Sequence, residues 1–308
     1  MAIIRGFLIL MIGHVGTAHA EPPRVATDIA PVYALVSQVM EGVGLPDLVI
    51  AQNASPHDYA MRPSEARALS RADLVVWIGP ALTPWLGDNL DTLAGDARKI
   101  ELMQVPGTVT LALRDGAGFD DHSAEDHASE GDAEHGVDAH AWLDPRNAVV
   151  WIGAIAAELA QIDPQNADIY LTNAGQAQAE LADLEETIRA RLAPLNGTPF
   201  VVYHDAYHYF EARFGLEATA AISLSDAAAP TAAQVSNVRA TLARTGAKCV
   251  LAEPGFNPGL VAAVAAGDDG IRTSVLSSTA TADALGPRSY VALLEAMSDG
   301  LHACLSPQ

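Results

Sequence analysis

The sequence predicts an α/β protein with two similar lobes, each a mostly parallel sheet flanked by helices, joined by one long rigid helix. From Arg24 to about Pro164, short apolar or β-branched runs are each followed by a helical pattern, and the same alternation returns after Pro199. Apolar runs without polar alternation are typical of parallel strands buried on both faces. The repeated pattern therefore indicates two lobes of one architecture.

The individual elements follow from this alternation. In the first half, we expect strands at 24–28, 47–50 and 73–79, with helices at 31–43 and 63–72. In the second half, we expect strands at 199–204, 217–223, 248–253 and 271–277, with helices at 206–215, 231–246 and 258–267. Strands that alternate with helices favour parallel βαβ connections.

The segment between the halves predicts the long helix. Residues 166–195 are rich in Ala, Leu, Glu and Gln, with no proline before Pro194 and a single glycine, Gly175. A flexible linker would instead be rich in Gly, Ser or Pro. We therefore assign residues 21–162 to the first lobe, 163–194 to the linking helix and 195–308 to the second lobe. Helical spacing predicts that the helix buries a stripe formed by Leu171, Leu181, Leu184, Ile188 and Leu192.

The first twenty residues predict a cleaved secretory signal peptide. They hold one cation, Arg5, then an apolar run from Gly6 to Gly13 and small residues at Ala18 and Ala20. A membrane anchor would need a longer apolar run. We therefore expect an exported chain that begins at Glu21.

The charge balance excludes one class of partner. The chain has 38 Asp and Glu against 17 Lys and Arg, for a net charge of −21. An acidic surface repels phosphate backbones and attracts cations, so we expect no nucleic-acid partner.

One segment departs from the α/β pattern. Residues 116–139 contain eight acidic residues, three histidines (His122, His127 and His135) and no basic residue. Such a segment cannot form a core, so we expect a mobile surface loop. It offers carboxylate and imidazole groups for auxiliary metal capture or sensing, although a solvated acidic loop is the alternative.

The two cysteines predict a disulfide. Cys249 and Cys304 are the only two in a chain that we expect to fold outside the cytoplasm, where disulfides persist. The alternative, a cysteine metal site, lacks the C-x-x-C spacing that such sites show.

Three histidines lie where a ligand site is expected. His57 lies between a strand and a helix, His204 ends a strand, and His140 follows the acidic segment just before a helix. In open α/β sheets, ligands bind at the carboxyl ends of the strands. Three imidazoles suit Zn²⁺ in tetrahedral geometry, with a carboxylate or water as fourth ligand. We therefore predict that these histidines converge on one transition-metal ion.

A zinc peptidase is the alternative from a different class. His204 and His208 are spaced i, i+4, as in the H-E-x-x-H motif, but Asp205 replaces the glutamate and His204 ends a strand. We therefore interpret His208 as a partly buried, hydrogen-bonded residue.

Four ordered motifs carry a resemblance to a known family: PHDYAMRPSE, DAHAWLDPRNA, VVYHDAYHYF and LAEPGFNP. The chain resembles the zinc-specific solute-binding proteins of ABC importers, known as cluster A-I or family 9. The resemblance covers essentially the whole mature chain. It implies two lobes joined by a rigid helix, with His57, His140 and His204 as metal ligands. A His-rich acidic insertion before the second ligand is common in that family and matches 116–139.

The resemblance also bears on the metal and its fourth ligand. Manganese-binding relatives usually carry a carboxylate at the third position, where this chain has His204, so zinc is preferred. Some zinc relatives place glutamate directly before the first histidine, but Pro56 occupies that position here. Asp283 matches a metal-facing aspartate of many members, with water as the rival. Glu253 is interpreted as a carboxylate outside the ligand set that orients a histidine.

These observations predict a periplasmic, high-affinity Zn²⁺ receptor that delivers its ion to an ABC permease and catalyses no reaction. We expect a monomer, and a periplasmic zinc chaperone is a second candidate partner. The alternatives are a manganese or other divalent-metal receptor of the same family, the peptidase, and a metal buffer or adhesin in which the acidic loop does most of the binding.

Overall fold

The computed structural model describes residues 21–52, 54–57, 59–114, 119, 136–223, 230–255, 257–279 and 285–307. The predicted signal peptide, the loop histidines His122, His127 and His135, and Asp283 lie outside the described residues.

The first lobe is a four-stranded parallel sheet in the order β2-β1-β3-β4. Its strands are β1 (Val25–Thr27), β2 (Asp47–Leu48), β3 (Leu74–Trp77) and β4 (Arg98–Glu101). Its helices are α1 (Ala30–Val39), α2 (Pro63–Leu69), α3 (Pro84–Leu93) and α4 (Pro145–Ile162), with short 3₁₀ turns η1 (Leu102–Gln104) and η2 (Ala141–Leu143). β1 and β3 are buried throughout, as the absence of polar alternation predicted.

The second lobe repeats this arrangement. Its parallel sheet has the order β6-β5-β7-β8, so both sheets place their first strand between the second and the third. The strands are β5 (Phe200–His204), β6 (Ala218–Ser223), β7 (Cys249–Ala252) and β8 (Arg272–Val275). The helices are α6 (His208–Phe214), α7 (Ala232–Thr245), α8 (Pro258–Ala265) and α9 (Ser289–Leu305). The predicted fold class is confirmed.

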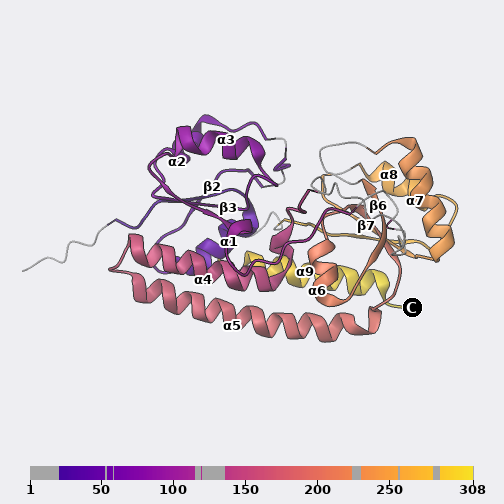
Figure 1. The fold of residues 1–308 in the computed structure, drawn as a ribbon. Helices are drawn as coiled ribbons and strands as arrows, with labels where there is room; N and C mark the ends of the chain where they lie inside the picture. The colour runs from indigo at the N-terminus through magenta and orange to yellow at the C-terminus, as the bar shows by residue number, and fades with distance from the viewer. Residues whose placement is uncertain are drawn as a thin grey trace, which may run out of the picture.

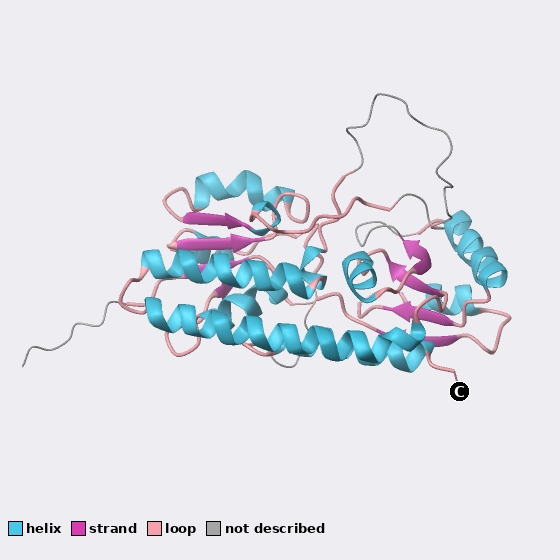
Figure 2. Cartoon of the chain, turned by 60° about the horizontal axis from the view of Figure 1, so that its bottom comes forward, coloured by secondary structure: helices cyan, strands magenta, loops and turns pink. Residues whose placement is uncertain are grey.

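The long helix α5 (Ala167–Leu192) runs beneath both lobes and continues into the 3₁₀ turn η3 (Ala193–Leu195) (Figure 1). Its 26 residues span about 39 Å at 1.5 Å per residue. Figure 2 shows it beside α4, and it also contacts α1 and α9. The predicted stripe was wrong at one position: Leu171 is 52% exposed, and its neighbour Tyr170 is buried instead.

The two lobes share one apolar core. A single cluster of buried side chains extends from Val25 in β1 through Trp142 in η2 to Leu294 and Leu305 in α9. A smaller cluster lies between the second sheet and helices α7 and α8. Because the larger cluster crosses between the lobes, apolar packing as well as α5 joins them.

The predicted disulfide is confirmed. Cys249 in β7 is bonded to Cys304 in α9, with 5.6 Å between their Cα atoms, and both residues are buried. The bond attaches the last helix to the centre of the second sheet. As for the membrane, none of the helices in the described ranges combines the length and hydropathy needed to cross a bilayer.

Candidate metal centre

The structure brings two of the three predicted histidines, His140 and His204, close together between the lobes and places His57 farther away. His204 ends β5, His140 directly precedes η2, and His57 lies in the loop between β2 and α2. The ring centroids of His140 and His204 are 5.1 Å apart, and those of His57 and His140 are 6.3 Å apart. Zinc–nitrogen bonds of about 2.0–2.1 Å require ligating rings to lie within roughly 5–6 Å of each other. The first pair already has this spacing.

The donor atoms are not yet gathered as tightly as a bound ion requires. Within the described ranges, no group of three or more His, Cys, Asp or Glu side chains is already arranged to hold a metal ion. Asp283, the predicted fourth ligand, is not among the described residues.

The loop that carries His57 is held by side chains of the first lobe. Trp85 Nε1 in α3 donates a hydrogen bond of 2.8 Å to the carbonyl oxygen of Pro56. Tyr59 donates through its hydroxyl to Glu65 Oε1 at 2.8 Å, and Glu65 Oε2 accepts from the backbone N–H of Arg62 at 2.6 Å. These bonds fix the residues on both sides of His57, which itself is half-buried.

His140 is oriented by a buried carboxylate. Its Nδ1 lies 2.7 Å from Asp138 Oδ1, and its backbone N–H donates to the same oxygen at 2.9 Å. Burial opposes ionisation of Asp138, but the charge and hydrogen bonds of His140 outweigh it and lower the pKa of this carboxyl. A carboxylate that accepts from Nδ1–H leaves Nε2 as the free nitrogen of the ring.

His204 has an equivalent arrangement. Its Nδ1 lies 2.9 Å from Glu253 Oε1, which follows β7, and both residues are buried. Ser278 Oγ donates to the other oxygen, Glu253 Oε2, at 3.3 Å. The contact between Glu253 and a histidine matches what the sequence predicted for this residue.

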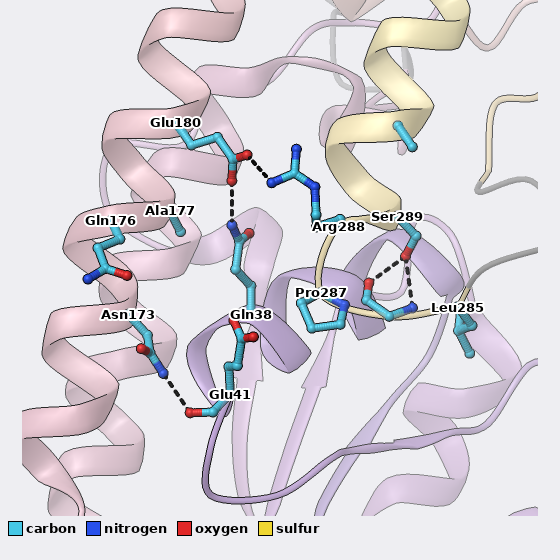
Figure 3. A pocket seen from close by; sticks show the side chains of 12 residues that line it. Gln38, Glu41, Asn173, Gln176, Ala177, Glu180, Leu285, Pro287, Arg288 and Ser289 are labelled. Carbon is cyan, nitrogen blue, oxygen red and sulfur yellow. Dashed lines mark hydrogen bonds and ion pairs between the residues drawn. The ribbon is translucent and has the colours of Figure 1, made fainter.

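A cavity of about 260 Å³ adjoins these side chains. It is lined by His140, Trp142, His204, Glu253 and the segment 277–279. A larger cavity of about 570 Å³ lies elsewhere, between α1, α5 and the start of α9. Glu180 lines this larger cavity. Its carboxylate accepts hydrogen bonds from Gln38 Nε2 at 3.0 Å and from Arg288 Nη1 at 2.7 Å (Figure 3). Its lining contains no histidine or cysteine, so the smaller cavity is the candidate metal centre.

The residues of the peptidase alternative are engaged elsewhere. Asp205 receives hydrogen bonds of 3.0 Å from Arg114 Nε to both of its oxygens, and Arg114 Nη1 donates to Glu211 Oε2 at 2.7 Å. His208 is partly buried as predicted, but its Nδ1 lies 3.8 Å from Asp138 Oδ2, so the predicted hydrogen bond was wrong.

Sequence reasoning missed several residues around the site. Asp138 lies two positions before His140 in DAHAW, and that spacing was a readable signal. Trp142 lies in the same motif, two positions after His140, but Tyr209, Ser278 and Tyr290 come from distant segments and nothing in the sequence pointed to them.

Fold and site together define a class: two-lobed α/β binding proteins with a histidine cluster between the lobes and a rigid helix beneath them. Within this class, the chain belongs to the family described as zinc-uptake complex component A, periplasmic, whose sequence model matches residues 25–304. The resemblance noted from the motifs is thereby confirmed.

Named relatives and solved structures agree with this assignment. The chain is 38% identical over 326 residues to the high-affinity zinc uptake system protein ZnuA of Paracoccus denitrificans, covering 98% of this chain and 99% of that protein. It is 34% identical to the protein of the same name from Brucella suis, covering 93% and 92% of the two chains. The periplasmic zinc-binding protein TroA of Treponema pallidum has the same fold, with a TM-score of 0.79 at 21% identity over 93% of this chain and all of that one. A Pseudomonas aeruginosa protein, FpvC, solved with Mn²⁺, also has this fold, with a TM-score of 0.76 at 21% identity over 92% and 98% of the two chains.

Proposed function

We propose that this protein is a periplasmic receptor that binds Zn²⁺ with high affinity and delivers it to the permease of an ABC importer. The observation that carries the proposal is the pair His140 and His204, whose rings lie 5.1 Å apart beside one cavity. A buried carboxylate contacts Nδ1 of each ring, which directs each Nε2 toward metal binding. The family and the names of the zinc-uptake relatives support the same function.

The proposed ligand set is His57, His140 and His204, with Asp283 as the fourth ligand. Asp138 and Glu253 hold the second and third histidines through Nδ1 and do not themselves bind the ion. Three imidazoles favour zinc over manganese, which prefers oxygen ligands. A site closed by four protein ligands leaves no position for an activated water, which agrees with a family of receptors and not of enzymes.

Metal analysis of purified variants tests the ligand set. His57→Ala, His140→Ala, His204→Ala and Asp283→Ala should each reduce the affinity for Zn²⁺, whereas His302→Ala in α9 serves as a matched control and should not. Competition with Mn²⁺ addresses the choice of metal. Unchanged affinity in the His140→Ala and His204→Ala variants would refute the proposed site.

A second experiment separates the interlobe site from the acidic segment. We propose that residues 116–139, through His122, His127 and His135, capture zinc only as an auxiliary. Deletion of residues 117–138 would also remove Asp138, so a deletion of 120–135 keeps the carboxylate that holds His140. The tight site should survive this deletion. Its loss would favour the buffer or adhesin alternative.

The partners and the oligomeric state belong to the same proposal. A receptor of this family requires a cognate permease in the inner membrane, and a periplasmic chaperone would load it with zinc. We propose a monomer that is released into the periplasm after cleavage before Glu21. Mass spectrometry of the periplasmic fraction and light scattering of the purified protein test these points.

A further inference from the structure

We infer that Trp142 and Ser278 are positioning residues of the zinc site, and that they fasten His140 and His204 into one preformed pair. The inference rests on the proposed function, because it concerns the same two ligands. It assigns roles to residues outside the ligand set and predicts which part of the site is ready before the ion arrives.

His140 comes from the first half of the chain, and its neighbours are bound to both lobes. Within the first lobe, Asn147 Nδ2 in α4 donates to the carbonyl oxygen of Ala141 at 3.1 Å. Tyr209 in α6 donates through its hydroxyl to the carbonyl oxygen of Asp138 at 2.8 Å. Tyr290 in α9 donates in the same way to the carbonyl oxygen of Trp142 at 2.6 Å. The backbone is therefore held two residues before and two residues after His140, in both cases by tyrosines of the second lobe.

Trp142 connects this segment to the surroundings of His204. Its side chain is 1% exposed, and its ring centroid lies 5.1 Å from that of His140. Its Nε1 donates to the carbonyl oxygen of Ser278 at 2.7 Å. A buried indole N–H with a good partner fixes the ring in one orientation, and the ring then limits the positions open to His140.

Ser278 continues the connection to the second ligand. Its hydroxyl donates to Glu253 Oε2 at 3.3 Å, and Glu253 Oε1 contacts His204 Nδ1 at 2.9 Å. Ser278, Glu253 and His204 are all buried. An unbroken series of contacts thus runs from the ring of His140 through Trp142, Ser278 and Glu253 to the ring of His204.

The segment around His57 has bonds of its own within the first lobe. Two of them run from Trp85 to the carbonyl oxygen of Pro56 and from Tyr59 to Glu65. The ring of His57 is also farther from His140 than the ring of His204 is, at 6.3 Å against 5.1 Å. The pair His140 and His204 therefore has the closer ring spacing of the two.

The first test is Trp142→Phe, which keeps an aromatic ring and removes the indole N–H. Residues around the ligands of metal sites typically change affinity by about 10- to 100-fold, and we expect a loss in this range for Zn²⁺. Trp151→Phe is the matched control, because Trp151 is equally buried and donates a similar bond, to Thr108 Oγ1 at 2.9 Å, away from the site. Equal affinities for the two variants would overturn the role of Trp142.

The second test is Ser278→Ala, which also covers the case in which Trp142→Phe fails to fold. Bound Co²⁺ reports ligand geometry through its visible absorption, so the released Glu253 should alter that spectrum as well as weaken binding. Ser278→Thr keeps the hydroxyl and should restore both the zinc affinity and the cobalt spectrum of the parent. Ser289→Ala is the control, since Ser289 is about as buried as Ser278 but its Oγ donates to the carbonyl oxygen of Gly286 at 2.6 Å, away from the candidate metal centre. A cobalt spectrum identical to that of the parent would count against Ser278.

A double-mutant cycle separates positioning from general loss of stability. If Trp142 acts through His140, Trp142→Phe should cost less than about 2-fold in affinity once His140→Ala has removed the ring. The full penalty in that background would overturn the connection from Trp142 to His140 and leave only the connection through Ser278 and Glu253 to His204. If instead His140→Ala and His204→Ala leave zinc affinity unchanged, it is the proposed function that fails, so the two failures are distinguishable.

Discussion

Asp28 at the end of β1 accepts a hydrogen bond of 2.8 Å from the backbone N–H of Ile78 at the end of β3, and this bond joins the carboxyl ends of two neighbouring strands. Its other oxygen accepts from the backbone N–H of Ile29 at 2.8 Å, and the side chain is completely buried. Burial raises the pKa of Asp28 to about 7, although these backbone hydrogen bonds oppose the shift. A carboxyl group of the first lobe therefore titrates near neutral pH.

This shift predicts a pH dependence of stability. Between the ordinary pKa of about 4 and the raised value, the folded protein binds the proton that the unfolded chain releases. The contribution of protonated Asp28 to the free energy of unfolding is therefore fully present below about pH 4 and is lost as pH rises toward 7. Relative to the Asp28→Asn variant, the free energy of unfolding of the parent should fall by on the order of 2–3 kcal/mol between pH 5 and pH 8. Urea unfolding at the two pH values measures this change. A difference that is constant over this range would contradict the prediction.

Removal of the charge of Arg114 should strongly destabilise the folded protein. It pairs with Asp205 and Glu211, and both carboxylates are buried. Arg114→Leu leaves them without their cation, so we expect a loss of about 3–5 kcal/mol in the free energy of unfolding. Arg24→Leu is the control, because Arg24 pairs with Asp73 in an exposed position and should cost less than about 1 kcal/mol. Similar losses for the two variants would argue against a structural role for the buried cluster.

The disulfide predicts sensitivity to reduction. Cys249 and Cys304 are 55 residues apart in the sequence. In the chain-entropy model, a disulfide that closes a loop of this length stabilises the folded protein by about 4 kcal/mol. The Cys249→Ser, Cys304→Ser double variant should therefore unfold at lower urea, and dithiothreitol should shift the parent but not the variant. The zinc stoichiometry of the folded variant should stay the same, because neither cysteine lines the candidate metal centre. A loss of zinc with intact folding would be the contrary result.

The shared core predicts little movement between the lobes. Apolar side chains from both lobes pack in one cluster, and opening a cleft would expose them to water. Small-angle scattering of the metal-free and zinc-bound protein should therefore give nearly superimposable profiles. A large decrease in the radius of gyration on binding would show a hinge motion that this packing does not allow.

Local patterns in the sequence predicted most of the fold and the histidines of the site. Fully buried strands followed by helices are visible without an alignment, and so are histidines at strand ends. The error at Leu171 arose because one long helix contacts several elements, and its buried face passes through Tyr170 instead. Spacing alone does not fix the phase of such a helix.

The connections around the histidines were not predictable, because they join distant segments. The bond from Trp142 to Ser278 spans 136 residues, and the one from Tyr290 to Trp142 spans 148. The pairing of Arg114 with Asp205 likewise depends on where the chain crosses from the first lobe to the second. No local rule for spacing, charge or propensity reports such pairings. Asp138 and Trp142, each two residues from His140, lay within reach of a sequence pattern.

The position of α9 has a consequence for how the molecule assembles. This helix is the final one in the chain, yet it packs against α1 and α5 and is bonded to the centre of the second sheet. The core shared by the two lobes is thus incomplete until residues 289–305 have emerged. Folding cannot finish lobe by lobe during synthesis, so the final step is late and couples all parts of the chain.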